Sequence, residues 1–238
     1  MTMRLALLSL VLALTSAVWA AADEPQDTRC YELRVYTAGP DKLDALHSRF
    51  RDHTCKLFEK HGMTNVGYWT PVENPEQKLY YILSYPDRDA RKKAWAGFMS
   101  DPEWLAAYRA SEKDGRLAVK VESTMLHATD YSPAIKPGEG KQPQVFELRT
   151  YTTTPGNLKN LDARFRDHTI ELFSKHGMKH FGYWHLDDDQ KGADETLVYL
   201  LSHRSRESRD SSFEAFRDDP AWIAARDASE KAAGGSLT

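Results

Sequence analysis

The sequence contains one domain-sized segment twice. Residues 31–37 read Tyr-Glu-Leu-Arg-Val-Tyr-Thr, and residues 146–152 read Phe-Glu-Leu-Arg-Thr-Tyr-Thr, an offset of 115 positions. The same offset relates Arg-Phe-Arg-Asp-His-Thr at 49–54 to its copy at 164–169, and Lys-His-Gly-Met and Gly-Tyr-Trp also recur at it. A longer loop in the second copy then raises the offset to 118. Such a period is too long for a solenoid unit and indicates a tandem duplication of one small domain.

The repeated segment alternates strictly between apolar and polar residues, which predicts a β-strand with two unlike faces. We expect the apolar face to pack against helices and the polar face to be free of them. The apolar face carries Tyr31, Leu33 and Val35, and the polar face carries Glu32, Arg34 and Tyr36.

Each repeat is predicted to have the element order βαββαβ. A helix should follow the first strand and end at Gly62, because glycine commonly ends helices. Strands at 66–70 and 79–85, a helix at 88–99 that restarts at Asp101-Pro102, and a strand at 117–128 complete the first copy. This is the ferredoxin-like α+β plan, an antiparallel sheet with helices on one face.

Two such domains can close their helix-free faces against each other, and the tandem copy supplies the partner. The sequence therefore predicts two ferredoxin-like domains at 29–133 and 144–238, joined by a linker at 134–143 that is rich in Pro and Gly. The second copy ends at Thr238, where its fourth strand would begin. We expect either that the sequence is a shortened chain, which we favour, or that the second domain lacks its last strand.

Composition places the chain among ordinary globular proteins. Its 238 residues are 41% hydrophobic and 28% charged, with a net charge of −3. Because there is no basic excess, nucleic acid is not an expected partner.

The N-terminus has the layout of a secretory signal peptide. A short positive start is followed by an apolar run from Leu5 to Ala17 and by small residues before Asp23. We expect residues 1–22 to be cleaved, which leaves no stable membrane span, and the mature protein to be periplasmic or secreted. Export permits a disulfide between Cys30 and Cys55, but their predicted positions favour two unpaired thiols.

The combined motifs resemble those of the NIPSNAP family over nearly all of the predicted mature chain. They are Glu-Leu-Arg-x-Tyr, Arg-Phe-Arg-Asp-His-Thr, Lys-His-Gly-Met, Gly-Tyr-Trp and Asp-Pro-x-Trp. The resemblance implies a dimeric α/β barrel, in which two ferredoxin-like sheets meet, here as a pseudo-dimer within one chain. It implies no settled biochemistry. Relatives with this barrel include cofactor-independent monooxygenases, haem-using enzymes and simple ligand binders.

The candidate ligand-binding residues lie on the polar strand faces and in the Gly-Tyr-Trp motifs. An arginine there can hold an anionic ligand through two hydrogen bonds, or can simply neutralise the neighbouring glutamate. The aromatic residues can line a pocket or belong to the core. The candidates are Glu32, Arg34, Tyr36, Trp69, Glu147, Arg149, Tyr151 and Trp184.

Two functional interpretations remain open. The favoured one is a small-ligand-binding or protein-interaction module, without cofactor or metal, which could form homo-oligomers through its sheet edges. The alternative is a cofactor-independent monooxygenase or isomerase that acts on a small aromatic or acidic compound. A haem protein would have His61 or His176 as its ligand. The usual metal and nucleotide motifs are absent from the sequence.

Overall fold

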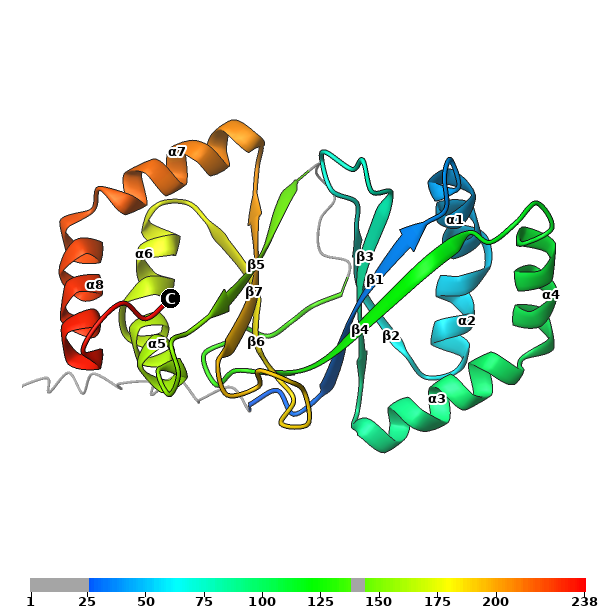
Figure 1. Ribbon diagram of the computed structural model, residues 1–238, viewed down its shortest axis with the longest axis horizontal. Coiled ribbons are helices and arrows are strands. Elements are labelled where there is room, and N and C mark those ends of the chain that lie inside the picture. Colours follow the sequence, from blue (N-terminus) through cyan, green and yellow to red (C-terminus); the bar gives the residue numbers. More distant parts are fainter. Residues whose placement is uncertain (1–25, 138–143) are drawn as a thin grey trace, which may run out of the picture.

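The computed structural model describes residues 26–137 and 144–238. The first repeat has the predicted element order, and the second follows it up to its last helix (Figure 1). The first repeat comprises β1 (Cys30–Ala38), α1 (Leu43–Arg49), η1 (Phe50–Thr54), α2 (Cys55–Lys60), β2 (Thr64–Trp69), β3 (Lys78–Tyr85), α3 (Arg88–Ser100), α4 (Pro102–Ser111) and β4 (Ala118–Ala128). The second comprises β5 (Val145–Thr152), α5 (Leu158–Arg164), η2 (Phe165–Thr169), α6 (Ile170–Lys175), β6 (Lys179–Leu186), β7 (Thr196–His203), α7 (Arg206–Arg217) and α8 (Pro220–Ala233). Within the described residues the first repeat has four strands and the second has three.

Strand β4 joins the two repeats into one antiparallel sheet of order β2-β3-β1-β4-β6-β7-β5. Along most of its length β4 pairs with β1 of its own repeat. Its last residues also pair with β6, where Ala128 lies opposite Trp184. Within the described residues, β2 and β5 are the two ends of this sheet.

The strands form the middle of the molecule and the helices form its two outer sides (Figure 1). Helices α1–α4 cover the first repeat on one side, and α5–α8 cover the second on the other. A core of apolar side chains from both repeats fills the space between the two parts of the sheet; it includes Tyr31, Ile82, Leu126, Trp184 and Leu200. The expected pseudo-dimer with meeting sheets is confirmed.

The predicted assignment of the two faces of the first strand is wrong. Tyr31 and Leu33 belong to the core between the sheets, whereas Tyr36 packs with the core under the helices of the first repeat. The reason is that the helices carry the partners of the polar residues. Arg91 and Trp95 of α3 both donate hydrogen bonds to Glu32, which has no exposed surface. The side that no helix covers receives the apolar residues instead.

The predicted first helix of each repeat contains one wider, π-helical turn, at η1 and η2, both with the sequence Phe-Arg-Asp-His-Thr. In each, the threonine hydroxyl donates to the carbonyl of the arginine five residues earlier, at 3.2 Å for Thr54 and Arg49 and 3.0 Å for Thr169 and Arg164. Such turns often lie at functional sites. Here each follows directly after a buried arginine.

Cys30 and Cys55 are free thiols, as expected. Burial raises the pKa of Cys30 to about 11, so this thiol is protonated at neutral pH. The predicted signal peptide, 1–22, lies outside the described residues, as does the linker from 138 onward. None of the helices in the described ranges combines the length and apolar character that a membrane span requires.

Candidate functional site

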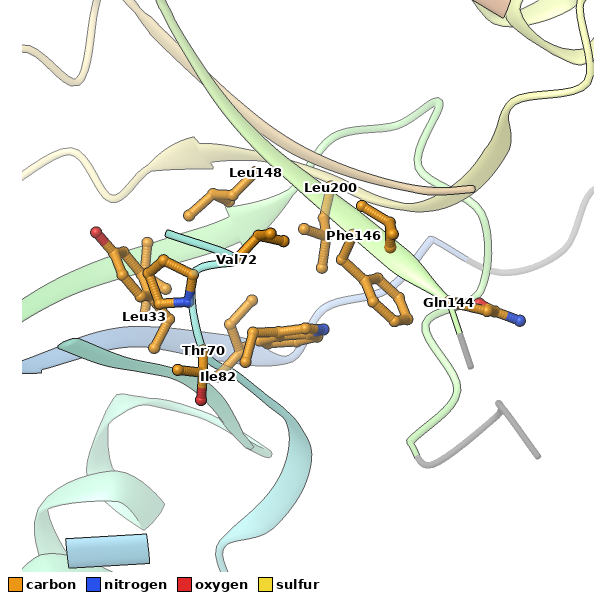
Figure 2. Close-up of a pocket in the computed structure, with 12 residues that line it drawn as sticks. Leu33, Thr70, Val72, Ile82, Gln144, Phe146, Leu148 and Leu200 are labelled. Atoms are coloured by element: carbon orange, nitrogen blue, oxygen red, sulfur yellow. The ribbon is translucent and has the colours of Figure 1, made fainter. Parts of the chain in front are cut away.

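A cavity of about 330 Å³ lies between the two parts of the sheet, beside β2 and β5, the strands at its two ends (Figure 2). Its walls come from both repeats. Leu33 and Ile82 belong to β1 and β3, Trp69 ends β2, and Phe146 and Leu148 belong to β5. Most of these side chains are aliphatic or aromatic, which is the usual lining of a small-molecule pocket.

The cavity exists because the two junctions between the repeats differ. At one junction β4 fills the space between β1 and β6, and Trp184 beside it has no exposed surface. At the other junction no strand lies between β5 and β2 within the described residues. Trp69, the counterpart of Trp184, lines the cavity there and packs edge-on against Phe146, with 5.7 Å between ring centroids.

The polar groups of the cavity are few and uncharged. Among its described lining residues, only Thr70, Tyr80 and Gln144 have polar side chains besides the indole of Trp69. None of these lining residues is a carboxylate, imidazole, amine or guanidinium. The site is therefore suited to a neutral, largely apolar molecule, with a small number of hydrogen-bonding groups to orient it.

Glu32 and Arg34 lie under α3, away from this cavity. The Arg34 guanidinium contacts Glu32 at 2.6 Å and Tyr81 at 2.9 Å. Burial alone would raise the pKa of Glu32, but hydrogen bonds from Arg91 and the charge of Arg34 lower it to about 2. This carboxylate is thus ionised and compensated by the protein itself.

Tyr36 lies on the same side, packed edge-on against Phe50 at 5.7 Å. The structure therefore brings Glu32, Arg34 and Tyr36 together, but beneath helices and not between the sheets.

The second copy of these residues borders a different cavity, of about 290 Å³, between β5 and helices α5–α8. Arg149 and Tyr151 line it, and Arg149 donates to the Tyr151 hydroxyl at 2.8 Å. Glu147 accepts from Arg149 at 3.1 Å and from Arg209 at 2.6 Å. The eight predicted site residues thus do not form a single site.

His61 and His176 bond to the aspartates that cap the next helices. His61 Nε2 lies 2.7 Å from Asp101 Oδ2, and His176 Nε2 lies 2.8 Å from Asp219 Oδ2. The other side chain that contacts each aspartate is a lysine. Neither His–Asp pair therefore has a further metal-binding side chain beside it. Across the described residues, no group of three or more His, Cys, Asp and Glu side chains is arranged to hold a metal ion.

Of the predicted site residues, only Trp69 lines the cavity between the sheets. Sequence reasoning missed Phe146, Leu148 and Leu200. For Phe146 and Leu148 the available signal was the alternation of the repeated strand, whose apolar residues were assigned to the wrong face, whereas Leu200 lies on β7. Val72 and Gln144 lie outside the strands, and no pattern in the sequence singles them out.

The NIPSNAP family model matches residues 31–133 and 146–234, one match for each repeat. No curated protein matches the chain. A solved NIPSNAP family protein of unknown function from Agrobacterium tumefaciens is 23% identical, with a TM-score of 0.41, over 46% of this chain and 96% of that chain. A NIPSNAP-like domain protein from Burkholderia xenovorans is 20% identical, with a TM-score of 0.42, over 47% and 94%.

A third solved structure, a candidate monooxygenase from Fusobacterium nucleatum, is similar over both repeats. It is 10% identical, with a TM-score of 0.54, over 86% of this chain and 87% of that chain. At this identity the similarity shows a shared fold alone.

Proposed function

This chain belongs to the NIPSNAP family, and from this premise we propose that it binds a small, uncharged and largely apolar molecule between its two sheets. The observation that carries the proposal is the cavity of about 330 Å³ bounded by Trp69, Phe146 and Leu148. Small-molecule sites have volumes of roughly 300–1,000 Å³ and mostly apolar walls.

The physical basis of binding would be the removal of apolar surface from water. Each Å² of apolar surface buried contributes roughly 25 cal/mol. Aromatic rings at the cavity, Trp69 and Phe146, can add edge-to-face contacts with an aromatic ligand. Thr70, Tyr80 and Gln144 can orient one polar group of that ligand.

We place binding ahead of catalysis because general acid–base chemistry needs a titratable group within reach of the reacting atom. Among the described lining residues, Tyr80 is the one conventional proton donor. The monooxygenase or isomerase alternative therefore has no specific observation in its favour at this cavity.

The test uses the neutral fluorescent probe N-phenyl-1-naphthylamine, whose emission rises in apolar sites. We expect saturable binding by the native protein and its loss in Leu148→Trp, because the larger ring fills the cavity. Ile223→Trp, on the outer helix α8 and 38% exposed, adds the same indole elsewhere and should bind normally. Equal binding by both variants, with both folded by circular dichroism, would overturn the proposal.

We also propose that the protein acts outside the cytoplasm, on the support of the signal-like sequence at 1–22. Mass spectrometry of the protein from cell fractions would test this. Export predicts a mature N-terminus between about residues 20 and 23 in the exported fraction. Full-length protein found only in the cytoplasm would contradict it.

A homo-oligomer formed through sheet edges remains a further proposal. It is supported by the free edges of β2 and β5 within the described residues, because unpaired strands present backbone donors and acceptors. Light scattering of the purified protein at increasing concentration would test it, and a monomer throughout would contradict it.

A further inference from the structure

We propose that the second repeat contains a separate binding site for a small aromatic carboxylate, in the cavity of about 290 Å³ between β5 and its helices. Five arginines line this cavity, against one lining glutamate, Glu230, and the last residue of the sequence, Thr238, also lines it. The arginines are Arg149, Arg164, Arg209, Arg217 and Arg226. This site lies on the opposite side of β5 from the cavity between the sheets and does not depend on it.

The first repeat provides an internal comparison, because the same positions differ there. At the offset of 118, Arg217 replaces Met99, Arg226 replaces Tyr108, and Phe213 replaces Trp95. In the first repeat, rings occupy the corresponding space. The Arg34 guanidinium lies 4.4 Å from the Trp95 ring, and that of Arg49 lies 5.4 Å from the Tyr108 ring.

Compared with the first repeat, the second therefore has two arginines in place of a methionine and a tyrosine. It also has a phenylalanine in place of a tryptophan. The smaller ring of Phe213 takes less space than that of Trp95, and the two arginines add positive charge at the same cavity. Neither is needed for the fold, since the first repeat forms the same elements without them.

A buried arginine in this cavity also lacks a close counter-ion. In the first repeat, Arg49 pairs with Glu112 at 2.6 Å and with Ser111 at 3.2 Å. Arg164, its counterpart, is equally buried at 5% exposure, but its nearest carboxylate oxygen among the described residues, on Glu230, is 3.8 Å away.

The Ser229 hydroxyl lies at 3.5 Å from Arg164, at the limit of a hydrogen bond. Burial accordingly lowers the pKa of Arg164. A buried charge without a well-placed partner is costly, and a bound anion would compensate it.

The carboxylates of Glu147 and Asp227 are already engaged by arginines. Glu147 accepts from Arg149 and Arg209, and Asp227 accepts from Arg226 at 2.8 Å. Arg217 is exposed and has no ion pair within the described part of the chain. Arg164 and Arg217 are therefore the guanidinium groups with charge to offer a ligand, and guanidinium binds carboxylate through two parallel hydrogen bonds.

The remaining walls select an aromatic ligand over a simple inorganic anion. Most of them are aromatic: Tyr151, Phe165, Phe173, Phe213, Phe216 and Trp222, beside Thr169 and Thr238. The π-helical turn η2 starts at Phe165, directly after Arg164, and both residues line this cavity. A carboxylate attached to an aromatic ring matches both groups.

The experiment is calorimetric titration of the full chain with benzoate, with inorganic phosphate and benzyl alcohol as comparison probes. We expect benzoate to bind more tightly than either, because phosphate lacks the ring and benzyl alcohol lacks the charge. The double variant Arg217→Met/Arg226→Tyr installs the residues of the first repeat. It should keep the fold and weaken benzoate binding at least about tenfold, as expected for lost charge-assisted hydrogen bonds.

Arg206→Met is the matched control, because it removes an exposed arginine from the same helix as Arg217, outside the cavity. It should bind benzoate as the native protein does. Undetectable benzoate binding at about 10 mM, equally tight binding of benzyl alcohol, or unchanged affinity in the double variant would each overturn the proposal. None of these outcomes affects the neutral-probe test of the cavity between the sheets.

Discussion

Arg34 Nη1 lies 2.6 Å from Glu32 Oε1 under helix α3, where the Glu32 side chain is fully buried and that of Arg34 is 13% exposed. Arg91 approaches the same carboxylate at 2.7 Å, and the Ser123 hydroxyl donates to it at 2.6 Å. Each of these donors comes from a different element, so the carboxylate ties β1, α3 and β4 to one another. The network contributes to the fold of the first repeat without any ligand.

We predict that Glu32→Leu destabilises the protein by about 3–5 kcal/mol, because it leaves Arg34 buried without a carboxylate. The double variant Glu32→Leu/Arg34→Met should recover about 1–3 kcal/mol of that loss, since Arg91, whose side chain is 25% exposed, can turn to solvent. Urea unfolding measures the free energy of unfolding of both variants. Glu73→Leu, at an exposed position, should stay within about 0.5 kcal/mol of the native protein. A double variant no more stable than Glu32→Leu would contradict this account.

The same network predicts how stability depends on pH. The pKa of Glu32 is lowered to about 2 in the folded protein, from an ordinary value of 4.5. A carboxylate with a depressed folded-state pKa stabilises the fold above its unfolded-state pKa, and this stabilisation is lost as the pH falls towards the folded value. We therefore expect the free energy of unfolding to fall between about pH 5 and pH 2, with about 3 kcal/mol of the loss due to Glu32.

Urea unfolding of the native protein and of Glu32→Gln across this pH range checks the prediction. Other carboxylates with lowered pKa values, such as Glu147, contribute equally to the pH dependence of the free energy of unfolding in both proteins. The variant should therefore show a shallower fall. Parallel curves would show that Glu32 does not have its low pKa in the folded state.

The architecture could be predicted because it depends on local patterns that occur twice. Alternation predicted β1 and β5, glycine predicted the end of the first helix at Gly62, and Asp101-Pro102 predicted the start of α4. The face assignment could not be predicted from the strand alone. It depends on Arg91 and Trp95, which lie about sixty residues further along the chain and compensate Glu32 only after folding.

The candidate site was harder to predict from the sequence for the same reason. The cavity lies where the ends of β2 and β5 approach each other, and no local pattern encodes a space between strands. Trp69 was predicted because an aromatic residue ends a repeated motif. The differences between the repeats at Arg217 and Arg226 were visible in the sequence, but their convergence with Arg164 became visible only in the structure.

The core positions of the helices that follow the π-helical turns provide a further prediction. Leu57 and Leu172 are 2% and 8% exposed, whereas Lys56 is exposed. We expect Leu57→Ala and Leu172→Ala each to cost about 2–5 kcal/mol, and Lys56→Ala no more than about 0.5 kcal/mol. Thermal unfolding compares the three variants, and similar midpoints for all of them would show that the buried face is wrongly assigned.

The last prediction concerns the glycine of the two Gly-Tyr-Trp motifs, which the tryptophan ring of the same motif covers. A Cβ atom on Gly182 would lie 2.6 Å from the Trp184 ring, and one on Gly67 would lie closer still to the Trp69 ring. Both distances are too short for carbon atoms, so the ring must move if alanine is introduced. The two rings differ in their freedom to do so.

Trp184 has no exposed surface and packs against Tyr31, so its ring is confined. Gly182→Ala should therefore cost about 1–3 kcal/mol, the usual cost of overpacking a core. Trp69 borders the cavity between the sheets and can move into it. Gly67→Ala should cost less stability, but it should weaken binding of N-phenyl-1-naphthylamine because the displaced ring occupies the ligand space. Urea unfolding and probe titration of the two variants measure these effects. A larger loss of stability in Gly67→Ala, or unimpaired probe binding by it, would contradict the assigned role of Trp69.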